Sequence, residues 1–204
     1  MSEPPLSRQF GHIDIYLFDQ LLRGRIAPGM RVLDAGCGSG RNLVYLLREG
    51  YDLWAIDRDP LAVEAVRALA AELAPTLPAE RFRACAVDEM PFPDASFDVV
   101  ISNAVLHFAR DHRHFEAMVH EMWRVVAPRG LLFARLASSI GMADRMRPLG
   151  EGCHLLPDGS ERYLVDEGRL LALTSRLGAT LLDPLKTTVV QDARCMTTWV
   201  IARR

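Results

Sequence analysis

The sequence predicts a single α/β domain, residues 1–204, built on a doubly wound, mostly parallel seven-stranded sheet with an antiparallel last strand. Between residues 30 and 136, short apolar runs alternate with segments of helical periodicity, which is typical of a parallel sheet covered by helices. The last two apolar runs, 180–185 and 196–202, are too close for a helical crossover, so we expect them to pair antiparallel.

The composition is that of an ordinary globular protein, and it disfavours nucleic acids and membranes as binding partners. The formal net charge is −2, so nucleic acid is not an expected partner. Residues 1–10 lack the apolar core of a signal peptide and no uncharged apolar run could span a bilayer, which predicts a cytoplasmic protein without membrane contact. The four cysteines are scattered without a CxxC pair, so we expect free thiols and no metal site. The oligomeric state is left open.

The first elements lead to a glycine-rich turn. An N-terminal helix is predicted over 12–26 from apolar residues at helical spacing, and a strand follows over 30–35. The run Asp34-Ala35-Gly36-Cys37-Gly38-Ser39-Gly40 then turns the chain into helix formers at 43–48. Glycines let the main chain approach a ligand that a Cβ atom would exclude, so this corner predicts a nucleotide or nucleoside site.

The spacing of the three glycines separates two kinds of ligand. A dinucleotide fingerprint has glycines at i, i+2 and i+5. Here they stand at Gly36, Gly38 and Gly40, and the i+5 position is Arg41. This spacing disfavours a pyrophosphate and favours a nucleoside without phosphates.

The later elements complete the alternation. Asp59 and Pro60 begin one helix and Asp166 caps the last one, which ends at Gly178. Apolar runs predict further strands, and a periodic stretch predicts a helix between two of them. The strands are expected at 52–57, 82–87, 97–102 and 131–136, and the helix at 115–126.

Residues 137–165 are less regular and rich in glycine and proline, and we interpret them as a substrate lid. Its polar residues are candidate substrate contacts, chiefly Arg145, His154 and Tyr163. Arginines in this stretch would suit a carboxylate or phosphate on the substrate. A solvated loop is the alternative interpretation.

The glycine turn resembles the first motif of the class I S-adenosylmethionine-dependent methyltransferases. The ending Gly40-Arg41-Asn42 and the following Tyr45-Leu46 resemble a small bacterial branch that includes tellurite-resistance-type enzymes. The resemblance implies a Rossmann-like methyltransferase fold, S-adenosylmethionine as cofactor, and a cofactor half over 30–110. It also implies that the N-terminal helix closes over the methionine end, and Tyr16 in this helix is a further candidate substrate contact.

Polar residues stand at the ends of four predicted strands. Asp34 and Asp57 end the first two, Asp88 follows the third and Asn103 follows the fourth. The carboxyl ends of parallel strands meet at one edge of the sheet, so these side chains are expected around one crevice.

The resemblance places all four residues in the cofactor site and implies a separate role for three of them. Asp57 would accept the ribose hydroxyls and Asp88 the adenine amine, while the main chain at Glu89 and Met90 reads the ring edge and Arg58 covers one ring face. Asn103 would hold the methionine amino group. The main chain and small side chains of the turn would line the rest of the cofactor, namely Gly36, Cys37, Gly38 and Gly40. As alternatives, Asp88 and Asn103 are ordinary loop or turn residues.

His107 is the candidate general base, because it follows the fourth strand near the expected methyl group. The alternative is a structural histidine at a helix start. Methyl transfer is an in-line displacement that depends mainly on orientation, so a base is needed only for a protonated acceptor. His112, His114 and His120 are interpreted as surface residues.

We therefore expect a methyltransferase that acts on a small-molecule acceptor. A catalytically silent domain that binds S-adenosylmethionine as a sensor or partner is the first alternative. A nicotinamide-dependent oxidoreductase is the second, and the glycine spacing disfavours it.

Overall fold

The computed structural model describes residues 6–204, so the first five residues of the predicted domain lie outside the described residues. The main sheet has the strand order β10-β11-β5-β4-β1-β2-β3. Its strands are β1 (Arg31–Ala35), β2 (Asp52–Asp57), β3 (Phe82–Ala84), β4 (Phe97–Asn103), β5 (Val126–Ala137), β9 (Thr180–Leu181), β10 (Lys186–Val190) and β11 (Arg194–Ala202). The helices are α1 (Leu6–Phe10), α2 (Ile15–Leu22), α3 (Val44–Arg48), α4 (Pro60–Leu73), α5 (His112–Val125) and α6 (Glu167–Arg176), with short 3₁₀ turns η1 (Ala79–Arg81), η2 (Leu106–Phe108) and η3 (Ala143–Arg145).

Strand directions confirm the predicted fold class. β1 pairs in parallel with β2 and β4, and β4 pairs in parallel with β5. The last strand, β11, is antiparallel to β5 and inserts between β5 and β10. The sheet is therefore parallel except at the strand that ends the chain.

The predicted strand at 180–185 is wrong in extent. β9 covers only 180–181, the chain bends through Pro184, and β10 occupies 186–190 within the expected connection. Proline has no N–H to donate to a neighbouring strand, so it interrupts pairing at this point. The true β10–β11 turn contains Gln191 and Asp192, both at φ 53°, which is the left-handed conformation that tight hairpins require.

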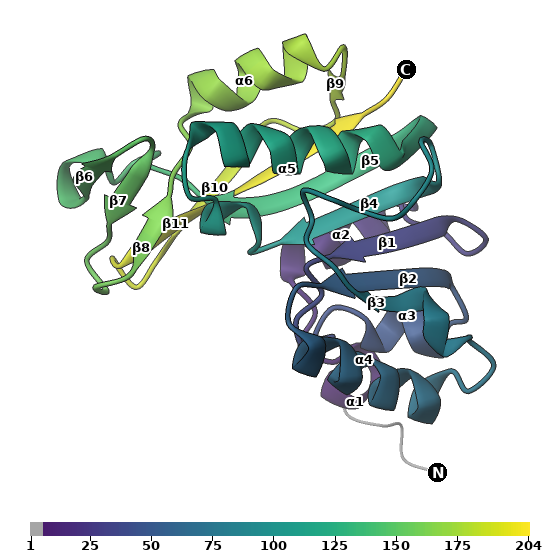
Figure 1. The fold of residues 1–204 in the computed structure, drawn as a ribbon. Coiled ribbons are helices and arrows are strands. Elements are labelled where there is room, and N and C mark those ends of the chain that lie inside the picture. Colours follow the sequence, from purple (N-terminus) through teal and green to yellow (C-terminus); the bar gives the residue numbers. More distant parts are fainter. Residues whose placement is uncertain (1–5) are drawn as a thin grey trace.

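Helices cover both faces of the sheet, with α5 and α6 on one side and α1, α3 and α4 on the other (Figure 1). β1 shows how its side chains divide between the two faces. Leu33 packs in the core beneath α5 and α6, whereas Val32 packs with α2, α3 and α4. The alternation follows from the two-residue period of a strand, so both faces of the sheet are apolar and buried.

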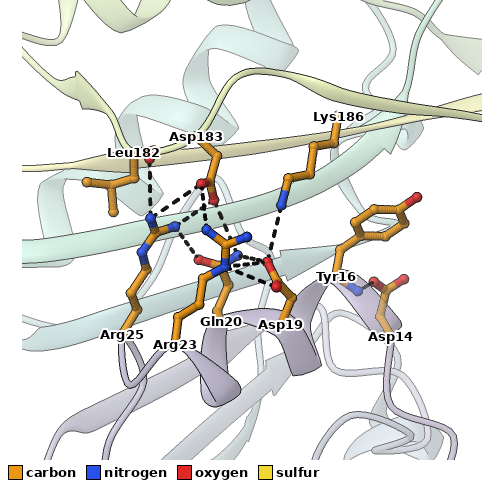
Figure 2. A network of polar contacts seen from close by, with 9 residues as sticks. All are labelled: Asp14, Tyr16, Asp19, Gln20, Arg23, Arg25, Leu182, Asp183 and Lys186. Atoms are coloured by element: carbon orange, nitrogen blue, oxygen red, sulfur yellow. Dashed lines mark hydrogen bonds and ion pairs between the residues drawn. The ribbon is translucent and has the colours of Figure 1, made fainter.

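The N-terminal helix α2 is shorter than predicted, and polar contacts join it to β10, the edge strand of the sheet. Asp14 caps α2 by accepting the N–H of Tyr16 at 2.9 Å. Figure 2 shows the polar network that joins α2 and the turn after it to the segment between β9 and β10. Arg25 Nη1 lies 2.5 Å from Asp183 Oδ2, and Lys186 Nζ lies 3.2 Å from Asp19 Oδ2. These pairs hold α2 beside the connection from β9 to β10.

The stretch 137–165 is more regular than the sequence suggested. It forms a separate antiparallel sheet of β6 (Arg147–Gly150), β7 (Cys153–Leu155) and β8 (Glu161–Tyr163), which we call the lid sheet. Tyr163 anchors it, because its ring lies 4.7 Å from the Phe115 ring centroid and its hydroxyl lies 2.9 Å from His112 Nδ1. The lid sheet is therefore attached to α5 by a buried ring contact and a part-buried hydrogen bond.

Within residues 6–204, none of the helices combines the length and apolar character that a membrane crossing requires.

Candidate functional site

Two adjoining cavities open at the carboxyl ends of the central strands. The first has a volume of about 670 Å³ and the second of about 450 Å³, both within the range of small-molecule sites. Arg41, Asn103, Ala104 and Phe108 line both cavities and form the junction between them.

The three glycines of the turn are required for different reasons, although all have positive φ. A Cβ on Gly36 would lie 2.4 Å from Cγ2 of Val105, and one on Gly40 would lie 3.1 Å from side chains of α4. A Cβ on Gly38 would meet nothing within 4 Å, and Gly38 lines the first cavity. Gly36 and Gly40 are thus required because neighbouring side chains pack against them, whereas Gly38 exposes its main chain to the first cavity.

Asp57, at the end of β2, holds the glycine turn in place. Its Oδ2 accepts the N–H of Gly38 at 2.9 Å and its Oδ1 accepts the N–H of Asp59 at 3.0 Å. Each carboxylate oxygen can accept more than one hydrogen bond. Asp57 can therefore support the turn and still accept hydroxyl groups from a ligand in the first cavity, which it lines.

Asp88 lies opposite a histidine that the sequence analysis placed on the surface. Its Oδ2 lies 3.4 Å from Nε2 of His114, whose side chain is 13% exposed and lines the first cavity. Nδ1 of His114 accepts the N–H of Arg110 at 3.1 Å, so the neutral ring carries its proton on Nε2, toward Asp88. The capping Asp111 places His114 in the first turn of α5, and this N-cap was the available sequence signal.

Asp34 lies beneath the turn and lines neither cavity. It is buried, and neither carboxylate oxygen has a hydrogen-bond partner within residues 6–204. Burial raises the pKa of Asp34 to about 7, against a smaller opposing effect of Arg41. Burial, with the nearby charges of Asp34 and Asp57, also raises the pKa of the Cys37 thiol, which disfavours a nucleophilic thiolate at this position.

The structure brings together most residues proposed for the cofactor. Gly40 and Asp34 pack beneath the turn instead, and the N–H of Met90 is donated to Glu121 at 2.8 Å, so it is engaged within the chain. Of the residues proposed for the cofactor, those that line the first cavity are Gly36, Cys37, Gly38, Asp57, Arg58, Asp88, Glu89 and Asn103.

The junction between the cavities has a strained backbone. Ala104 has φ 63°, unusual for a residue with a side chain, and its N–H donates to the Arg135 carbonyl at 2.8 Å. Asn103 Oδ1 accepts Arg41 Nη2 at 2.7 Å, while its Nδ2 is buried without an acceptor within the described chain. The side chain of Asn103 thus offers a ligand a donor, which suits an oxygen atom better than the predicted methionine ammonium group.

His107 lines the second cavity and is buried. Its Nδ1 accepts the N–H of Ala137 at 3.3 Å, which places the proton of the neutral ring on Nε2. Burial, reinforced by Arg162 and Arg194, lowers the pKa of His107 to about 4. At neutral pH this histidine is therefore suited to donate a hydrogen bond rather than to act as a general base.

The proposed substrate contacts are dispersed. Tyr16 lies beside the second cavity, with its ring centroid 4.4 Å from Cζ of Arg135. Arg145 is exposed and pairs with Asp192 at 3.2 Å. His154 Nδ1 lies 3.0 Å from the Gly152 carbonyl oxygen, Tyr163 is buried, and neither lines a cavity.

Comparison with known families identifies the architecture around these cavities. A family model described as "Methyltransferase domain" matches residues 33–134, which is half of the chain. The chain belongs to this family. An uncharacterized methyltransferase of Bacillus subtilis, YodH, is 32% identical over 106 residues, 52% of this chain and 42% of that protein. The chain spans about two fifths of the length of the first curated relatives it matches.

Solved structures show that the Rossmann-like methyltransferase fold extends over more than nine tenths of this chain. Burkholderia thailandensis 1,6-didemethyltoxoflavin-N1-methyltransferase, with 1,6-didemethyltoxoflavin and S-adenosylhomocysteine bound, has a TM-score of 0.68 at 20% identity, covering 97% of this chain and 84% of that one. The [4+2]-cyclase SpnF has a TM-score of 0.71 at 16% identity, covering 92% and 80%. Identities this low establish the fold alone, and membership of the tellurite-resistance-type branch stays a prediction.

Proposed function

We propose that the chain is an S-adenosylmethionine-dependent methyltransferase that acts on a small-molecule acceptor by in-line transfer. The observation that carries this proposal is the bare main chain at Gly38, which borders the first cavity beside the carboxylate of Asp57. Membership of the methyltransferase family and the relatives' printed activities support it.

The residues of the first cavity fit this cofactor. Its four lining carboxylates, Asp57, Asp59, Asp88 and Glu89, outnumber its three lining arginines, and a small excess of negative charge suits a cationic sulfonium. When bound, S-adenosylmethionine supplies a methyl group to a lone pair of the acceptor, and the carbon–sulfur electron pair stays on sulfur. In this proposal Asp57 accepts the ribose hydroxyls, Asp88 accepts the adenine amine while His114 orients its carboxylate, and exposed Arg58 covers the ring.

The second cavity would hold the acceptor beside the junction. The stretch 137–165 contributes Leu156, Ser160 and Arg162 to its lining, which agrees with the proposed role as a substrate lid. His107 would donate from Nε2 to an acceptor oxygen. In-line displacement depends chiefly on an oriented acceptor, which this arrangement would supply without a general base.

Calorimetric titration with S-adenosylmethionine tests the proposal. We expect Asp57→Ala to lose about 2 kcal/mol of binding free energy, roughly 30-fold in affinity, because charge-assisted hydrogen bonds to the ribose are removed. The exposed Glu72, outside both cavities, provides the control Glu72→Ala, which should bind as the parent does. Melting curves separate lost binding from loss of the turn that Asp57 supports.

The same material distinguishes the alternatives. A silent binding domain would bind S-adenosylmethionine but transfer no labelled methyl group to any member of a small-molecule extract. A nicotinamide-dependent oxidoreductase would ignore S-adenosylmethionine at millimolar concentration and quench NADH fluorescence, and that result would refute the proposal.

A further inference from the structure

The second cavity is positively charged. Of the described residues that line it, four are arginines and one, Asp14, is a carboxylate. Arg135, Arg162 and Arg194 line this cavity and not the first, whereas Arg41 lines both. Net positive charge in a concave site favours an anionic ligand.

Arg135, on β5, is the most buried of these arginines. Its Nε lies 3.3 Å from Asp14 Oδ2, with both side chains 10% exposed, and its guanidinium lies over the Tyr16 ring. Its Nη1 is buried and has no hydrogen-bond partner within residues 6–204. A buried guanidinium nitrogen without an acceptor is destabilising, so it marks a position where a ligand oxygen is expected.

A second donor without an acceptor lies on the neighbouring strand. Asn103 is the register partner of Arg135 between β4 and β5, and its Nδ2 is also buried without a partner in the described chain. His107 adds a neutral N–H at Nε2 in the same cavity. A guanidinium, an amide and an imidazole N–H together form a donor set that a carboxylate can satisfy.

Arg162 and Arg194 add charge that the chain does not neutralise by close pairing. Arg162 Nη1 donates to the Glu161 carbonyl at 2.7 Å. Among residues 6–204, no carboxylate oxygen lies within 4 Å of a guanidinium nitrogen of Arg162 or Arg194. The nearby Asp158 is exposed, accepts the N–H of Ser160 at 2.9 Å and does not line the cavity.

We infer that the second cavity is the acceptor site and selects acceptors that carry a carboxylate, with Arg135 as the buried anchor and Arg162 and Arg194 around it. This inference rests on the proposed function. The methionine part of the cofactor also carries a carboxylate that could bind an arginine. Arg41 lines both cavities and is the arginine available to that carboxylate.

The probes are benzoate and hexanoate, each compared with its neutral amide, and binding is followed by NMR on the protein saturated with S-adenosylhomocysteine. We expect each carboxylate to bind about tenfold more tightly than its amide, as one charge-assisted hydrogen bond implies. Arg135→Met should abolish this preference, and the double variant Arg162→Gln/Arg194→Gln should reduce it several-fold. The control is Arg176→Gln, because Arg176 is 54% exposed, pairs with Glu116 and lies outside both cavities.

Equal binding of carboxylate and amide to the parent protein would overturn the inference. It would also fail if the arginine variants weakened S-adenosylhomocysteine but not 5′-methylthioadenosine, which lacks the carboxylate, since the arginines would then serve the cofactor. If Arg135→Met does not fold, the double variant decides. A parent protein that prefers carboxylates but binds no S-adenosylhomocysteine would refute the proposed function and leave the anion site standing.

Discussion

The two cavities share a junction but differ in charge and in construction. Four carboxylates and three arginines line the first, whereas four arginines and one carboxylate line the second. The first is built around one turn, held by the hydrogen bond from Gly38 to Asp57. The second depends on the packing of α2, the lid sheet and β11 against β5. Local backbone geometry therefore controls one site, and tertiary packing controls the other.

The first expected effect separates the two functions of glycine in the first cavity. Gly36→Ala should reduce the free energy of unfolding by about 3 kcal/mol, because its Cβ would lie 2.4 Å from Val105 in a left-handed backbone. Gly38→Ala should reduce it by only about 1 kcal/mol, since its Cβ meets nothing within 4 Å. Both variants should lose S-adenosylhomocysteine binding. Denaturant unfolding and calorimetry measure the two quantities.

The matched variant Gly36→Ala/Val105→Ala sharpens this result, because shortening Val105 removes the side chain that the new methyl group would meet. Part of the lost stability should return. If Gly38→Ala binds S-adenosylhomocysteine normally, main-chain approach at Gly38 does not determine ligand binding, and the contrast between the cavities is lost.

The contrast in construction also explains what the sequence could predict. Periodicity predicted the strands, and glycine spacing located the turn. Asp57 was then predicted because it ends a strand. Arg135 stands within an apolar strand and Arg194 stands at the start of one, and nothing in either local pattern indicates that they meet Arg162 and Asp14. Only strand register and the packing of α2 bring them together, and neither is encoded locally.

The next effect concerns the charge of Asp34 beneath the first cavity. Its pKa is about 7 when folded, against 3.8 ordinarily. Between these values the folded state holds a proton that the unfolded state releases, so stability falls as pH rises. Asp34→Asn should remove this fall and be more stable than the parent at pH 8 by up to about 4 kcal/mol, with little difference at pH 4.

The control for this pH series is Asp98→Asn. Hydrogen bonds from Arg31 outweigh burial and hold the pKa of Asp98 below its usual value, so that group contributes stability lost only as pH falls through the acidic range. Its difference from the parent should be flat between pH 5 and pH 8. An equally flat difference for Asp34→Asn would show that Asp34 is ionised without penalty in the folded protein.

The smallest effect tests whether the second cavity depends on the position of α2. Burial alone would raise the pKa of Asp183, but Arg25, Lys186 and Arg23 outweigh it and lower that pKa. The stabilisation is therefore present above the ordinary carboxyl pKa and lost as pH falls below it. Asp183→Asn should reduce the free energy of unfolding at pH 7 by about 1 kcal/mol, because it weakens the network in Figure 2.

The same variant should weaken benzoate binding a few-fold, since α2 and its cap carry Tyr16 and Asp14 beside Arg135. Binding of S-adenosylhomocysteine should stay unchanged, because no residue of α2 lines the first cavity. Arg23→Gln is the matched control, since Arg23 is 43% exposed and its ion pair is screened by solvent, so this variant should be as stable as the parent. If Asp183→Asn weakened the binding of benzoate and of S-adenosylhomocysteine equally, the position of α2 would control both cavities and not the second alone.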